Sequence, residues 1–282
     1  MELRGAPVAR AVTEGLQNDI ERLKTRGVTP CLAVVRVGAR GDDLSYEKGI
    51  AKRFAEAGCE VKSVPLAETC AQDELEAAML DLNGDKTVHG ILVLRPLPTH
   101  INTARVASLV SPEKDVDGMS ALSLGRVLMG DENAFAPCTA KAVVEMLDHY
   151  GIPLAGKRVT LVGRSAVVGK PLLALLVARD ATVTVCHTKT VDLTAECRRA
   201  DILVACAGKA GLITKEHIGE NCAVIDVGVN VVRDKLMGDV SPDAYEIAKS
   251  YTPVPGGVGA VTNAVLLAHT VRAAVLAQER AR

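Results

Sequence analysis

The chain lacks tryptophan and has only two phenylalanines and four tyrosines among its 282 residues. It therefore offers few aromatic rings on which the bases of a single-stranded nucleic acid could stack. The formal net charge is −1, with 33 basic and 34 acidic residues, so no basic footprint for a nucleic acid or an anionic membrane surface is visible. We expect no nucleic-acid partner and no membrane partner.

Metal and disulfide patterns are also missing. The eight cysteines are scattered through apolar stretches without a C-x-x-C pair, and the six histidines show no H-x3-H spacing. No secretory signal opens the chain, and no apolar run reaches the length that crosses a bilayer. The sequence thus predicts a soluble, cytoplasmic protein with reduced, mostly buried cysteines and no metal site.

Apolar, β-branched runs alternate with amphipathic segments along most of the chain. Strands are expected at 30–37, 59–66, 90–94, 158–162, 182–186, 200–207 and 222–227. Helices are expected at 8–26, 44–57, 71–82, 121–129, 139–150, 170–179 and 261–279. This rhythm is typical of open parallel sheets with helices on their faces, so the predicted fold class is α/β.

Length and alternation together indicate two domains. We expect an N-terminal open α/β substrate domain over 1–135 and a Rossmann-type dinucleotide-binding domain over 136–261. The apolar-faced helix within 262–282 is expected to return to the first domain. The segment 251–259, YTPVPGGVG, is too rich in proline and glycine to be regular, and we expect a shaped loop there.

The stretch 156–171, GKRVTLVGRSAVVGKP, shows a strand, a glycine turn and a helix start in immediate succession. Gly163 lets the backbone turn sharply, and Gly169 allows close packing where the helix begins. A phosphate fits such a helix N-terminus. The spacing is not G-x-G-x-x-G, and Pro171 after Lys170 is incompatible with a Walker A loop, so both a nucleotide site and an ordinary strand-to-helix turn fit these residues.

The next strand ends at Cys186, and the residues after it bear on the choice of dinucleotide. An NAD-binding domain carries an acidic residue near this point for the ribose 2′-OH, and none stands here. Arg164, Thr188 and either His187 or Lys189 offer a cation and donors for a 2′-phosphate instead. The sequence therefore predicts NADP, with a solvated surface arginine as the alternative for Arg164.

Several stretches together resemble the FolD family, the methylenetetrahydrofolate dehydrogenase/methenyltetrahydrofolate cyclohydrolases. They follow the family's order over nearly the whole chain: GILV and PLP within 90–98, KDVDG at 114–118, PCT at 137–139, VGRS and VGKP within 162–171, ATVT and CH within 181–187, VIDVG at 224–228, GDV at 238–240 and TPVPGGVG at 252–259. The resemblance implies NADP-dependent oxidation of 5,10-methylenetetrahydrofolate to the 5,10-methenyl form in one-carbon metabolism, followed by hydrolysis of that product. It also implies a homodimer with a folate cleft between the two domains of each chain.

The resemblance assigns site residues one by one. Tyr46 matches a tyrosine that stacks on the pterin, and Asp117 matches the aspartate that holds the pterin ring by hydrogen bonds. A solvated loop is the alternative for the segment 114–118 around Asp117. The substrate cleft is also lined by the family's proline-glycine loop, which here is Pro255, Gly256 and Gly257. The expected cofactor residues are Gly163, Arg164, Ser165, Gly169, His187, Thr188 and Val229.

The chain departs from the family's pattern in one region. Ile50 stands where enzymes that run both reactions carry a lysine, and Leu94 stands where they carry a glutamine. Lys48 and Lys52 flank Ile50 but project from other faces of the expected helix, so Lys52 is a weak catalytic candidate.

These losses affect the two reactions unequally. Hydride transfer needs mainly aligned placement of two bound molecules, whereas hydrolysis needs an activated water and proton transfer. We therefore expect a competent dehydrogenase with weak or absent cyclohydrolase activity. The alternatives are another two-domain NADP oxidoreductase, such as one resembling shikimate dehydrogenase, and a catalytically silent dinucleotide-binding protein.

Overall fold

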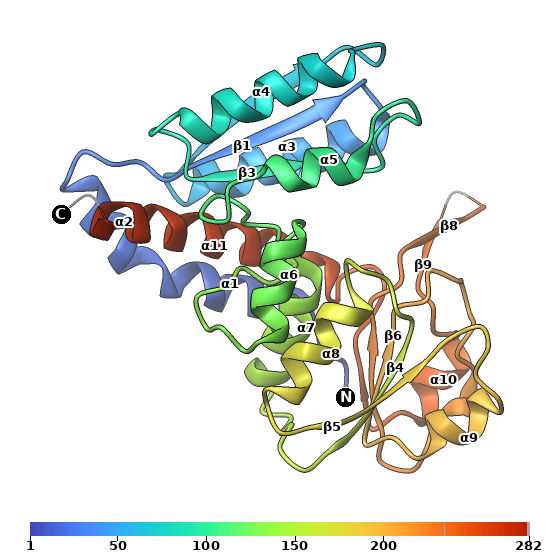
Figure 1. The fold of residues 1–282 in the computed structure, drawn as a ribbon. Coiled ribbons are helices and arrows are strands. Elements are labelled where there is room, and N and C mark those ends of the chain that lie inside the picture. Colours follow the sequence, from blue (N-terminus) through green and yellow to red (C-terminus); the bar gives the residue numbers. More distant parts are fainter. Residues whose placement is uncertain (234, 281–282) are drawn as a thin grey trace. The chain divides into compact units, whose positions relative to one another are not determined.

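The computed structural model describes residues 1–233 and 235–280, which form two compact units (Figure 1). Unit 1 comprises 1–10, 127–132 and 139–262. Unit 2 comprises 11–126, 133–138 and the described residues from 263 onward. Each unit carries its own parallel sheet, which confirms the predicted two-domain α/β fold.

Unit 2 is built on a three-stranded parallel sheet in the order β2-β1-β3. The strands are β1 (Cys31–Val37), β2 (Glu60–Leu66) and β3 (Gly90–Val93), and the helices between them are α3 (Gly41–Glu56) and α4 (Gln72–Gly84). Alternate residues of a strand point to one face, so Ala33, Val35 and Val37 share a face and pack in one core with residues of α4 and α5 (Thr103–Leu109). This core therefore joins β1 and β3 to the two helices α4 and α5.

The N-terminal helical region differs from the expectation of one helix over 8–26. It forms two helices, α1 (Gly5–Gly15) and α2 (Gln17–Lys24). The break coincides with Gly15, a poor helix former, and with Leu16, whose N–H donates to the Thr13 carbonyl at 3.2 Å, a three-residue rather than a four-residue bond. The apolar spacing continues through the break, which is why the sequence pattern did not reveal it.

Unit 1 contains a five-stranded parallel sheet in the order β10-β7-β6-β4-β5. Its strands are β4 (Arg158–Val162), β5 (Thr182–Cys186), β6 (Ile202–Ala205), β7 (Ala223–Asp226) and β10 (Ser250–Tyr251). Its helices are α7 (Cys138–His149), α8 (Gly169–Val177), α9 (Leu193–Arg198) and α10 (Pro242–Ile247), with a 3-10 turn at Lys215–His217. Helix α6 (Ala121–Leu128) begins in unit 2 and ends in unit 1. Residue 251, expected to open an irregular loop, instead belongs to β10. Strand β10 has only two residues, which is too short for a periodic sequence pattern, and it is recognised as a strand because it pairs with β7.

The strand order places a topological switch point in unit 1. β5 lies on one side of β4 and β6 on the other, so the loops that follow β4 and β6 run in opposite directions. In open α/β sheets the crevice at such a point, outside the carboxyl ends of the strands, is where ligands bind. A two-stranded antiparallel hairpin, β8 (Asn230–Val232) and β9 (Lys235–Met237), projects from the end of β7 (Figure 1).

The long C-terminal helix α11 (Gly259–Arg280) begins in unit 1 and continues in unit 2 from Asn263, which confirms the expected return to the first domain. By length and mean hydropathy α11 could cross a membrane, so the expectation that no apolar run is long enough is wrong. In the structure 61% of its most apolar window is buried inside the protein, as in the core helix of a folded domain.

All eight cysteines are free thiols, and seven of them are buried, as expected of small apolar side chains. Within the described residues, no group of three or more His, Cys, Asp or Glu side chains could hold a metal ion.

The core of unit 2 yields a stability prediction from two leucines on the same helix. Leu75 on α4 is 0% exposed and belongs to the core, whereas Leu80 on α4 is 57% exposed. We expect Leu75→Ala to lower the free energy of unfolding by about 2–5 kcal/mol, because it removes buried methyl groups and leaves a cavity. Leu80→Ala should cost less than about 1 kcal/mol. Urea unfolding of the three proteins checks this, and equal costs at both positions would contradict the assigned core.

Candidate functional site

The segment 114–118, KDVDG, is an anchored turn rather than the solvated loop that was its alternative. Lys114 donates from Nζ to the last carbonyls of α4 at 2.6 to 2.8 Å and so caps that helix. Asp115 is fully buried and accepts hydrogen bonds from the N–H groups of Met119 and Ser120 at 2.8 and 2.9 Å. With its neighbours engaged in this way, the turn holds Asp117 in a defined place.

Asp117 interacts with three side chains of unit 2, which come from three separate parts of the chain. Oδ2 of Asp117 lies 3.1 Å from Nη2 of Arg95, which follows β3, and Cys138 at the start of α7 gives the carboxylate hydrogen bonds from its thiol and its backbone N–H. Burial raises the pKa of Asp117, and the charge of Arg95 opposes that shift. Burial also raises the pKa of the Tyr46 phenol on α3, with the nearby Asp117 charge adding to it. Tyr46 and Asp117 thus interact electrostatically, and the phenol keeps its proton.

Cys138 and Arg95 were not among the site residues expected from the sequence. The Cys138 Sγ lies 3.3 Å from the Val116 carbonyl and 3.8 Å from Nδ1 of His269 on α11. Burial holds the pKa of the thiol well above its ordinary value, so it stays protonated as a weak donor. The usable sequence signal was the position of each residue, since Cys138 starts a helix and Arg95 ends a buried strand.

The two positions that depart from the family's pattern are filled by apolar side chains. Ile50 is fully buried on α3, and Leu94 is buried directly after β3. Lys48 is exposed, and Lys52, with 78% of its side chain exposed, lies 3.9 Å from Glu56 on the solvent side. An α-helix turns about 100° per residue, so Lys52 lies roughly a third of a turn away from the face of Tyr46. The structure therefore does not bring Lys52 into the cluster around Asp117.

In unit 1 the turn after β4 is so tight that it leaves no room for a side chain at positions 163 and 169. Gly163 has φ +134°, and a Cβ on it would lie 2.3 Å from the carbonyl oxygen of Cys206 in the loop after β6. A Cβ on Gly169 would lie 2.3 Å from the Gly163 carbonyl. Ser165 accepts a hydrogen bond from the Val168 N–H at 3.1 Å just before α8 begins. The loops therefore meet at the switch point, where the backbone of α8 can approach a phosphate closely.

The expected partners of a 2′-phosphate lie along the same sheet edge. Val162 pairs with Cys186, so Arg164 and Thr188 each come two residues after a paired end of adjacent strands, and both are exposed. His187 lies in a tight turn, in which its Nδ1 accepts from the Lys189 N–H at 3.1 Å. No acidic side chain stands in this turn, in keeping with the sequence expectation.

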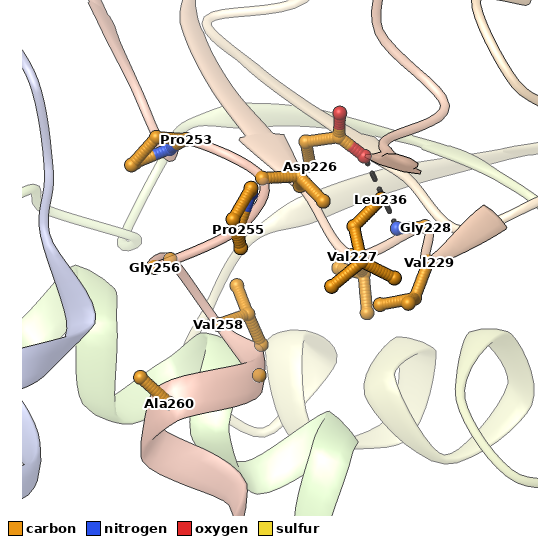
Figure 2. A pocket seen from close by; sticks show the side chains of 13 residues that line it. Asp226, Val227, Gly228, Val229, Leu236, Pro253, Pro255, Gly256, Val258 and Ala260 are labelled. Carbon is orange, nitrogen blue, oxygen red and sulfur yellow. Dashed lines mark hydrogen bonds between the residues drawn. The ribbon is translucent and has the colours of Figure 1, made fainter. Parts of the chain in front are cut away.

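A pocket of about 310 Å³ opens at the carboxyl end of β7 (Figure 2). It is walled on one side by Val227, Gly228 and Val229 and on the other by the segment 253–260. The expected residues Val229, Pro255, Gly256 and Gly257 therefore line one pocket. Its lining is largely apolar, which suits a flat, weakly polar ring better than a charged group.

Two buried aspartates fix one wall of this pocket. Asp226, at the end of β7, accepts four hydrogen bonds at 2.8 to 3.1 Å, from the backbone N–H groups of Gly228, Asp239 and Val240 and from the Tyr245 hydroxyl. Asp239 in turn accepts from the N–H groups of Ala207 and Gly208 at 2.6 and 2.8 Å and from Nδ2 of Asn230 at 3.0 Å. This pair, the aspartate clasp, joins the loops after β6 and β7 to the base of the β8–β9 hairpin.

The clasp leaves no room for a side chain at positions 228 and 238. A Cβ on Gly238 would lie 1.8 Å from Oδ2 of Asp226, and one on Gly228 would lie 2.1 Å from Oδ1 of Asp239. Burial raises the pKa of Asp226 to about 6, although its hydrogen bonds favour the charged form. The stretches DVG and GDV in the sequence are thus explained by the space and donors that two buried carboxylates require.

Two family models match successive parts of the chain. The model of the tetrahydrofolate dehydrogenase/cyclohydrolase catalytic domain matches residues 3–117, and the model of the NAD(P)-binding domain of the same family matches residues 137–278. The bifunctional protein FolD of Carboxydothermus hydrogenoformans is 46% identical over 275 residues, which are 96% of each chain.

Two solved structures are similar over their whole length. The bifunctional FolD enzyme of Campylobacter jejuni has a TM-score of 0.95 at 38% identity, with 98% of this chain and 99% of that chain covered. FolD of Trypanosoma brucei, solved with NADP and an inhibitor, has a TM-score of 0.93 at 37% identity, with 100% and 98% covered.

The aspartate clasp yields a prediction about unit 1. Asp226→Asn replaces an acceptor oxygen by an amide that faces donors, so we expect the free energy of unfolding to fall by about 3 kcal/mol or more. Glu220→Gln, at an exposed carboxylate of the same unit, should change it by less than about 0.5 kcal/mol. Calorimetric unfolding of both variants measures the difference. A clasp variant as stable as the Glu220 variant would show that these hydrogen bonds do not hold the loops.

Proposed function

Since the chain belongs to the FolD family of bifunctional methylenetetrahydrofolate dehydrogenases/cyclohydrolases, we propose that it oxidises 5,10-methylenetetrahydrofolate with NADP and hydrolyses the methenyl product weakly or not at all. The observation that carries the second part is the pair of buried apolar residues, Ile50 and Leu94, at the positions of the family's lysine and glutamine. Family membership argues against an unrelated NADP oxidoreductase.

In this proposal unit 2 holds the folate and unit 1 holds the dinucleotide. Asp117 accepts hydrogen bonds from the pterin, and the Tyr46 ring stacks on it. Pro255, Gly256 and Gly257 are also proposed substrate-binding residues. NADP supplies the acceptor for the hydride, and the protein's part is to bind and align the two molecules and to exclude water.

NADP fits the residues after β4 and β5. The glycines at 163 and 169 let the turn after β4 pack closely against the loop after β6 and the start of α8, and the positive end of the α8 dipole favours an anion there. Arg164 supplies the cation and Thr188 a hydroxyl for the 2′-phosphate, with no carboxylate to repel it.

Hydrolysis of the methenyl product lacks a proton-transfer group in this proposal. Ile50 and Leu94 offer neither a titratable group nor a hydrogen bond to a water. The exposed ammonium groups of Lys48 and Lys52 do not replace them, because neither projects from the face of α3 that carries Tyr46 and Ile50.

The proposal also covers the domain boundaries, the assembly and the location of the protein. We propose a folate domain over 1–135, completed by 262–282, and a dinucleotide domain over 136–261. We also propose a homodimer, as the family resemblance implies. The eight free thiols support a reducing compartment, the cytoplasm.

The cofactor preference can be tested at Arg164. We expect Arg164→Ala to raise the KM for NADP by about tenfold to a hundredfold, because a charge-assisted hydrogen bond to the 2′-phosphate is lost. The KM for NAD, which has no such phosphate, should change little. Lys157→Ala, just before β4 at the opposite end of the strand, is the control and should alter neither constant. Equal losses with NADP and NAD would assign Arg164 a general structural role.

The reaction balance can be tested by assaying both steps. We expect NADP-dependent oxidation of methylenetetrahydrofolate, while methenyltetrahydrofolate disappears at close to the buffer rate. The double variant Ile50→Lys/Leu94→Gln should gain hydrolysis by roughly 10²-fold or more, since a positioned proton-transfer group contributes about 10²–10⁴-fold.

Lys48→Ala and Lys52→Ala serve as controls and should leave both rates unchanged. Rapid hydrolysis by the unmodified protein would refute the cyclohydrolase part of the proposal, and its loss in either lysine variant would identify the substitute group. NADP binding without any turnover of methylenetetrahydrofolate would favour a silent dinucleotide-binding protein.

A further inference from the structure

Arg95 is a charged side chain in the folate half of the site to which neither the cofactor nor the family resemblance assigns a role. It follows β3 directly, and its Nη2 lies 3.1 Å from Oδ2 of Asp117. The two side chains are 29% and 21% exposed, so water screens their attraction less than it screens a surface pair. The main chain of Arg95 is itself held, because its carbonyl accepts from Nη2 of Arg40 at 3.2 Å.

The groups that face Asp117 come from four elements. Tyr46 faces it from α3 and Cys138 from α7, both with protonated side chains, and Asp115 lies in the same turn. His269 on α11 contacts the Val116 carbonyl at 2.8 Å through Nδ1 and reaches Asp117 only through Cys138. Among these described residues Arg95 is the permanent cation, because a guanidinium keeps its proton throughout the physiological range.

The protonation of Asp117 therefore depends on opposing effects. Burial and the negative charge of Asp115 raise its pKa, whereas Arg95 and the hydrogen bonds from Cys138 lower it. Arg95 is the larger of these lowering effects, and the hydrogen bonds from the thiol and the backbone N–H of Cys138 come after it. Loss of the guanidinium would remove the largest opposition to burial and would shift the carboxyl toward its neutral form.

We propose that Arg95 is a positioning residue for the folate reaction, which keeps Asp117 ionised and turned so that it accepts hydrogen bonds from the N–H donors of the pterin edge. The inference rests on the proposed function, in which Asp117 holds the pterin. A neutral carboxyl would present its own O–H to those donors and leave one of them unpaired, which is costly in a site shielded from water. Arg95 thus determines the pH range over which a reduced folate binds.

The test is the pH dependence of folate binding, measured with 5-formyltetrahydrofolate as the probe. Calorimetric titrations from about pH 5 to about pH 9 would compare the unmodified protein with Arg95→Leu and Arg95→Lys. Without the cation the pKa of Asp117 rises. As the pH falls, Arg95→Leu should therefore lose binding at a higher pH than the unmodified protein does, and its affinity at about pH 6 should be weaker by roughly tenfold or more. Arg95→Lys keeps the charge and should retain most of the original profile.

Arg105→Leu is the matched control, because it removes another arginine of unit 2 whose partner, Glu76, lies outside the cluster around Asp117. It should leave both the affinity and the profile unchanged. NADP binding and the thermal midpoint of each variant show whether it is folded.

Three results would overturn the inference. In the first, Arg95→Leu binds the probe with the original affinity and profile. In the second, Arg95→Leu and Arg95→Lys weaken binding equally at every pH, which would mean that the shape of Arg95 matters and its charge does not. In the third, the unmodified protein binds NADP but no reduced folate, and then the proposed function falls together with the inference.

Discussion

A carboxylate removed from water must be met by donors, and three buried aspartates impose that requirement on the loops of this protein. Asp115 gathers the backbone N–H groups that follow it and shapes the turn carrying Asp117. Asp226 and Asp239 gather backbone donors from three loops at the carboxyl edge of the larger sheet. In each unit a buried carboxyl group therefore holds the backbone of loops that carry candidate site residues.

The cluster around Asp117 combines apolar side chains with a fixed charge. Ile50 and Leu94 offer no group that could move protons, while Arg95 contributes a charge that does not titrate in the physiological range. Such an arrangement suits orientation and electrostatic control of a bound ring more than activation of water. It is consistent with a chain that keeps the hydride-transfer step, which depends mainly on alignment, and loses the step that depends on proton transfer.

In unit 1 the turn after β4 depends on two positions that carry no side chain, Gly163 and Gly169. The turn after β4 approaches the loop after β6 so closely that even a methyl group would clash at Gly163 and Gly169. In the proposed function the positive end of α8 lies beside this turn, and the choice of dinucleotide falls to the few side chains at the ends of β4 and β5. On that proposal the charge at Arg164 favours the phosphorylated dinucleotide.

From the amino-acid sequence alone we predicted every strand of the two parallel sheets except β10 to within a few residues, together with the return of the C-terminal helix and the family. A buried parallel strand is apolar along most of its length, and a glycine turn carries glycine, so both leave a local pattern. The break at Gly15 has a local cause, but the apolar spacing continues through it and conceals it. That β10 is a strand and that Arg95 pairs with Asp117 are visible in the structure alone, because both depend on segments far apart in the chain coming together, and no local pattern records which donor a buried carboxylate will meet.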